Sequence, residues 1–181
     1  MCNMKIITVK NFNDQYFEIE GLASTSNIDS YNEVIIQSGI DLSHLIGQGI
    51  PIDFEHGEVI GKITKASITE LGLWVEGIIY WNSPFSQLIY DNLNNRLPFE
   101  TNIKLSVEIE DPIYNSQGDT ILSGKLYAVA VCGFFEEAAN SHTFVKLLKS
   151  LKQPQIIKEI YQRASLDPIF KLNVLSLFIK K

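Results

Sequence analysis

Short runs of alternating apolar and polar residues, separated by polar turns, predict a chain rich in β-strands. Residues 5–9 and 15–23 are predicted strands, and in the second Phe17 and Ile19 alternate with glutamates, the period of a half-buried strand. A shorter strand is expected at residues 34–36. The pattern therefore indicates a sheet with one face on the core.

A hairpin and a helix follow in the middle of the chain. Residues 61–81 predict the hairpin, with a turn at residues 70–72 in which Gly72 tolerates the positive φ that such turns often need. Ser83 and Pro84 are typical of a helix N-cap and first helical position, and an apolar stripe follows them. We expect this helix to end at residues 94–95.

The last predicted strand, residues 124–132, is apolar on both faces and should be buried on both sides. Helices are predicted after it, at about residues 144–151, 155–164 and 168–178. The body is therefore a sheet or small barrel with one inserted helix, followed by a helical C-terminal section.

Length, composition and charge narrow the class of protein. A chain of 181 residues with 45% hydrophobic and 20% charged residues is expected to form one soluble domain with at most a short appendage. Two cysteines make no disulfide framework, and no secretory signal or membrane span is evident, so a cytosolic setting is expected. Eight of the 15 basic residues lie from Lys146 onward, which predicts a basic tail on an acidic body.

Two strands carry the candidate chemistry. The first, residues 50–56, ends in His56, and the second, residues 103–109, contains Ser106 on its polar face together with Glu108. A histidine can accept the proton that a serine hydroxyl loses when it becomes a nucleophile. His56 is in phase with the apolar residues of its strand, whereas Asp53 is predicted to point the other way and not to be its partner.

Other chemistries receive less support from the sequence. Three scattered histidines without a cysteine cluster give little support to a metal site. Cys132 ends a buried apolar strand, where thiols are usually inert. There is no glycine-rich phosphate loop and no basic motif with interleaved aromatic residues, so neither a nucleotide cofactor nor specific nucleic-acid binding is expected.

Six local motifs occur in a fixed order between about residues 15 and 145. They are Glu20–Ser24 with Asp29, Phe54–His56, Ile60–Ile63, Gly72–Gly77, Leu105–Val107, and the apolar strand Tyr127–Cys132 with its following Ala139–Asn140 pair. In this order the chain resembles the prohead (capsid maturation) proteases of tailed phages, which share a fold with the herpesvirus assemblins.

The resemblance implies a mixed α+β, β-rich fold. It would be a small, mostly antiparallel β-barrel of the herpesvirus-protease type over residues 1–145, with an inserted helix. A basic helical segment, residues 146–181, would be an appendage or a propeptide. The resemblance also implies a serine endopeptidase with no cofactor, in which Ser106 attacks the scissile carbonyl and His56 is the general base.

One position departs from the family pattern. The family's third catalytic residue matches Ala128, with Val129 as the next-best register, and neither side chain ionises. The chain could work as a serine–histidine dyad aided by a carboxylate from elsewhere, be a relative that no longer cuts, or carry an inactivating substitution at Ala128. Four residues are candidates for that carboxylate: Asp29, Asp111, Glu136 and Glu137.

The resemblance also sets expectations about partners and place. The substrates would be scaffold protein and capsid-protein extensions inside the assembling phage prohead, in the host cytoplasm. A second copy of the chain is a candidate partner, because assemblins act as dimers, whereas no membrane or specific nucleic acid is expected. Two other hypotheses remain: a non-catalytic capsid or scaffold component that keeps the protease fold, and an unrelated β-rich binding module.

Overall fold

The computed structural model describes residues 15–46, 49–97 and 101–149, and Gln15–Ser150 form one compact unit. The predicted strand at residues 5–9 and the predicted helices at 155–164 and 168–178 lie outside the described residues. Within the described part, no helix is long and apolar enough to cross a membrane.

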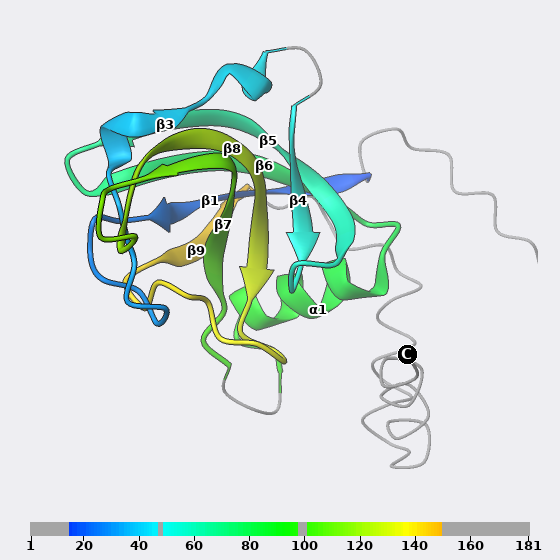
Figure 1. Ribbon diagram of the computed structural model, residues 1–181. Helices are drawn as coiled ribbons and strands as arrows, with labels where there is room; N and C mark the ends of the chain where they lie inside the picture. The colour runs from blue at the N-terminus through cyan, green and yellow to red at the C-terminus, as the bar shows by residue number, and fades with distance from the viewer. Residues whose placement is uncertain (1–14, 47–48, 98–100, 150–181) are drawn as a thin grey trace, which may run out of the picture. The chain divides into compact units, whose positions relative to one another are not determined.

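A single curved sheet of nine strands makes up most of the described chain (Figure 1). The strands are β1 (Tyr16–Ser24), β2 (Val34–Ile35), β3 (Ile40–Asp41), β4 (Ile50–Phe54), β5 (Glu58–Thr69), β6 (Gly72–Tyr80), β7 (Lys104–Tyr114), β8 (Thr120–Cys132) and β9 (Phe144–Lys149). Their order is β2-β8-β4-β5-β6-β1-β9, and both β3 and β7 also pair with β8. One α-helix, α1 (Pro84–Leu93), and two 3-10 turns, η1 (Gln37–Gly39) and η2 (Ser43–Leu45), complete the described elements.

The sheet is open, so the expected closed barrel is wrong for the described residues. The hydrogen-bonded path ends at β2 on one side and at β9 on the other. β9 pairs antiparallel with the edge of β1 opposite β6, and β7 forms its ladder with β8 alone. Most pairings are antiparallel, as expected, but β2, β3 and β4 all run parallel to β8.

β9 corrects the predicted helix at residues 144–151. Phe144 is 39% exposed and Val145 is 8% exposed, an alternation of outward and inward side chains that fits a strand. Gly21 explains how β9 approaches β1 so closely, because a Cβ at this position would lie 2.1 Å from the Phe144 carbonyl oxygen. Residues 146–149, which the sequence placed in the basic C-terminal segment, therefore belong to the sheet.

The predicted hairpin and helix are both confirmed. β5 and β6 pair antiparallel through a turn that ends at Gly72, whose φ is 135°. The Ser83 side chain caps α1 by accepting a hydrogen bond from the Phe85 backbone N–H at 3.3 Å. The Phe85 ring stacks on Phe54 with 4.1 Å between centroids, so the helix packs against the end of β4.

Candidate active site

Three neighbouring strands place the polar residues of the site on one face of the sheet. Across β4, β8 and β7, Asp53 is in register with Ala130, and Ala130 is in register with Ser106. Two residues further along β7, Glu108 is in register with Ala128. Directly paired residues share a face. Ala128 and Ala130 of β8 have short side chains, which leave room above β8 for the longer side chains of Asp53 and Glu108.

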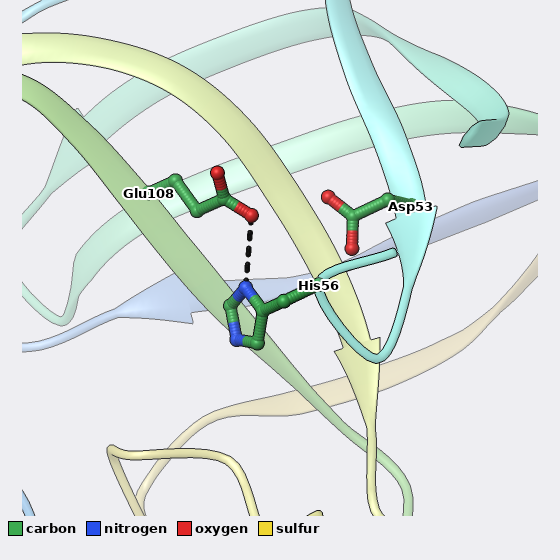
Figure 2. Close-up of side chains that lie close together, drawn as sticks. All are labelled: Asp53, His56 and Glu108. Carbon is green, nitrogen blue, oxygen red and sulfur yellow. Dashed lines mark hydrogen bonds and ion pairs between the residues drawn. The ribbon is translucent and has the colours of Figure 1, made fainter. Parts of the chain in front are cut away.

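His56 reaches this face from the turn after β4. Glu55 and His56 both have positive φ values, 52° and 56°, so the chain leaves the strand at Phe54 and reverses. The His56 Nδ1 atom lies 2.9 Å from Glu108 Oε1 (Figure 2). The two side chains are 35% and 34% exposed, so the pair lies at the boundary between core and solvent. With Nδ1 held by the carboxylate, Nε2 is the nitrogen free to accept another proton.

The Glu55 carboxylate holds the turn that carries His56. Its two oxygens accept hydrogen bonds from three successive backbone N–H groups, those of Phe134, Phe135 and Glu136, at 2.8, 3.3 and 3.0 Å. The Glu55 backbone N–H donates to the Val131 carbonyl at 3.1 Å. The loop after β8 and the histidine turn are therefore fixed to each other.

Ser106 and His56 line the same open cleft, so the structure brings together the two residues predicted from the sequence. The cleft has a volume of about 380 Å³, within the range of roughly 300–1,000 Å³ typical of ligand pockets. Ser106 is 6% exposed, and among the described residues it has no direct hydrogen bond with His56. Catalytic hydrogen bonds are often long in a free enzyme and shorten when substrate binds.

Two more of the sequence motifs, the end of β1 with Asp29 and the Ala139–Asn140 pair, lie beside Ser106. A second, smaller cavity against this serine is lined by Ser24, Thr25 and Asn140, among others. The Asn140 side chain donates to Thr25 Oγ1 at 2.9 Å, which joins the end of β1 to the loop before β9. These two motifs, the Ser106 strand and the His56 turn thus line adjoining cavities.

Asp53 does not point away from the histidine, and this prediction is wrong. Asp53 is 4% exposed, and Figure 2 shows its carboxylate turned toward Glu108 and His56. Because His56 lies in a left-handed turn rather than in the strand, strand alternation does not apply to it. A register shift between Ile52 and Asp53 in the pairing with β5 interrupts the regular pattern as well.

The environment of Asp53 is unfavourable for its charged form. The pKa of the Asp53 carboxyl is raised to about 6, mainly by burial and next by the nearby Glu108 charge, while His56 acts in the opposite direction. Asp53 Oδ1 is buried without a hydrogen-bond partner. Such a group is rare in folded proteins and calls for an explanation.

Glu108 is the carboxylate that contacts His56, and it was not among the acids expected from the sequence. It is in register with Ala128, the position that matches the family's third catalytic residue. Of the four acids expected as alternatives, Asp29 accepts hydrogen bonds from the Tyr31 and Glu33 backbone, and Asp111 pairs with Lys125. Glu136 and Glu137 line the cleft with His56, but neither makes a hydrogen bond or ion pair with it among the described residues. The available signal was the strand period, which puts Glu108 on the same face as Ser106.

Cys132 is fully buried at the end of β8. Burial, followed by the nearby carboxylates, raises the pKa of its thiol to about 12. The thiol is therefore neutral at physiological pH and poorly suited to nucleophilic attack.

Comparison with known proteins adds only distant likenesses. No family model and no curated protein matches this chain. Two solved structures to which it is similar are the varicella-zoster virus protease and the KSHV protease in complex with a hexapeptide phosphonate inhibitor. Their sequence identities are 17% and 19%, and the TM-score is 0.40 for each. The alignments cover 72% and 65% of this chain, and 63% and 60% of those proteases, so the chain spans about three fifths of their length.

Proposed function

We propose that this protein is a serine endopeptidase whose catalytic residues are Ser106, His56 and Glu108. The observation that carries the proposal is the 2.9 Å contact between His56 Nδ1 and Glu108 Oε1, made where His56 and Ser106 line one cleft. A histidine oriented by a carboxylate and placed near a serine is the arrangement that activates a hydroxyl nucleophile.

Each side chain has a defined task in this reaction. The Glu108 carboxylate accepts the Nδ1–H bond, which leaves the Nε2 lone pair for the Ser106 hydroxyl proton. Ser106 Oγ then bonds to the scissile carbonyl carbon while His56 takes that proton. The imidazolium gives the proton to the leaving amine, and a water molecule repeats the sequence to release the acyl group. Glu108 stays ionised and stabilises the imidazolium at each stage.

The position of Glu108 explains how the chain can have alanine at position 128, where the family pattern has its third catalytic residue. Directly paired residues on adjacent antiparallel strands have Cβ atoms about 4.5–5.5 Å apart and point to the same face. A carboxylate at Glu108 can therefore reach the region that an acid at Ala128 would occupy. In our proposal the acid has moved to the neighbouring strand, and the third catalytic residue is retained.

The biological substrate is proposed from the sequence resemblance. We infer that the enzyme cleaves scaffold protein and capsid-protein extensions during maturation of a phage prohead. An acidic body with a basic C-terminal segment fits a protein that docks inside the prohead through its C-terminal end. A second copy of the chain is a further candidate partner.

Co-expression with scaffold and major capsid protein tests this function. The unmodified chain should shorten one or both partners, and Ser106→Ala should leave them intact. An Ala128→Glu variant is included because it restores the acid at the position that matches the family. If none of the three proteins cuts while all are folded, the non-catalytic capsid or scaffold component becomes the better interpretation.

A further inference from the structure

The unpartnered Asp53 oxygen lies within a group of possible metal ligands. One ligand atom each from Asp53, His56 and Glu108 lies within 4.8 Å of the other two. Asp53 is 4% exposed, its Oδ1 has no hydrogen-bond partner, and the carboxylate is turned into the group (Figure 2). A bound cation would supply the partner that this buried oxygen lacks.

We propose that Asp53, His56 and Glu108 form a binding site for a divalent transition-metal cation, represented by Zn²⁺, and that the bound metal inhibits the enzyme. One imidazole nitrogen and two carboxylate oxygens are a ligand set that Zn²⁺ accepts, whereas Ca²⁺ and Mg²⁺ prefer oxygen alone. Three protein ligands leave a fourth position on a tetrahedral ion, which a water molecule can fill.

The geometry needs only small side-chain movements to hold the ion. Bonds of about 2.0–2.2 Å place the ligand atoms of a tetrahedral site about 3.4 Å apart. The His56 Nδ1–Glu108 Oε1 pair, now at 2.9 Å, would open by about 0.5 Å. Asp53 would move toward the other two by at most about 1.4 Å from the present 4.8 Å limit. His56 and Glu108 are each about one third exposed, so the ion has a route from solvent.

The inhibitory effect follows from the histidine tautomer and rests on the proposed function. When the metal binds Nδ1, the single proton of the neutral imidazole is carried by Nε2. Nε2–H has no lone pair for the Ser106 proton, and Glu108 no longer accepts from Nδ1. Metal binding itself does not depend on catalysis, so the two ideas can fail separately.

Calorimetric titration of the tag-free full chain with Zn²⁺, after treatment with a chelator, tests the site. We expect one equivalent to bind, and Asp53→Asn and Glu108→Gln each to weaken that binding by at least tenfold. Two controls should bind as the unmodified protein does: Ser106→Ala, which lies in the cleft, and Glu110→Gln, an acid two residues from Glu108 on the same strand. No binding at 100 µM Zn²⁺, or equal binding by the Asp53→Asn variant, would overturn the proposal.

The rate at which a fluorophosphonate probe labels Ser106 supplies the second measurement. Saturating Zn²⁺ should slow labelling at least tenfold, and chelator should restore it. Unchanged labelling at a Zn²⁺ concentration that saturates the site would overturn the inhibitory role while leaving the protease proposal intact. Zn²⁺ binding in a chain that the probe never labels would instead contradict the protease proposal and leave the metal site standing.

Discussion

The sharpest prediction concerns replacement of Glu108 by glutamine, which keeps the side-chain shape and removes its charge. Two unit charges 2.9 Å apart attract by about 1.4 kcal/mol at the dielectric constant of water and about 6 kcal/mol at an effective value near 20. The His56 and Glu108 side chains are about one third exposed, so we take an attraction of about 3 kcal/mol between the imidazolium and the carboxylate, which lies between these two limits. The loss of that attraction for the forming imidazolium corresponds to about a 100-fold slower acylation of Ser106.

Stopped-time labelling with a fluorophosphonate probe, followed by intact-mass measurement, gives this acylation rate without a known substrate. The Glu108→Gln variant should react about 100-fold more slowly than the unmodified protein in chelator-treated buffer. The matched control is Glu110→Gln, because Glu110 lies on the same strand but pairs loosely with Lys125 at 3.9 Å. A Glu108→Gln rate within threefold of the unmodified protein, with the same thermal stability, would refute the assigned role.

Three further predictions follow from the strands around the site. Adding Ala128→Glu to the Glu108→Gln variant should recover about tenfold in labelling rate, because residue 128 is directly paired with residue 108. No recovery in a folded double variant would contradict the cross-strand replacement. Cys132 should resist iodoacetamide at pH 8 in the folded protein and react once urea unfolds it, because its thiol is buried and its pKa is raised to about 12. Modification of Cys132 in the folded protein, measured by peptide mass, would contradict this. Gly21→Ala should lower the free energy of unfolding, measured in urea, by about 2 kcal/mol or more, because the new Cβ would collide with the Phe144 carbonyl. A loss below about 0.5 kcal/mol would show that β9 does not approach β1 so closely.

The sequence correctly predicted the elements whose formation depends on residues close together in the chain. The hairpin of β5 and β6 and the capped start of α1 at Ser83 both follow from turn and capping chemistry, which a sequence displays directly. The prediction at residues 144–149 failed because a short apolar run with lysines fits a helix and an edge strand alike. The free edge of β1 decides between them, and that edge exists only after the sheet has formed.

The candidate site was predicted in part for a similar reason. Ser106 and His56 stood out through the order of the motifs around them, and they line one cleft. The partnership of His56 with Glu108 depends on two features the sequence does not display: the left-handed turn at residues 55–56 and the register of β7 on β8. Asp53 was misplaced because strand alternation was extended through that turn.

The most direct test of the central claim is to locate the probe on the protein. The full chain is treated with a fluorophosphonate, digested and analysed by tandem mass spectrometry, beside a His56→Ala variant. We predict one adduct per chain, on the Ser106 hydroxyl, and its loss in the variant. A folded protein that takes up no probe, or that carries it on other residues at a rate independent of His56, would contradict the assignment of Ser106 as an activated nucleophile.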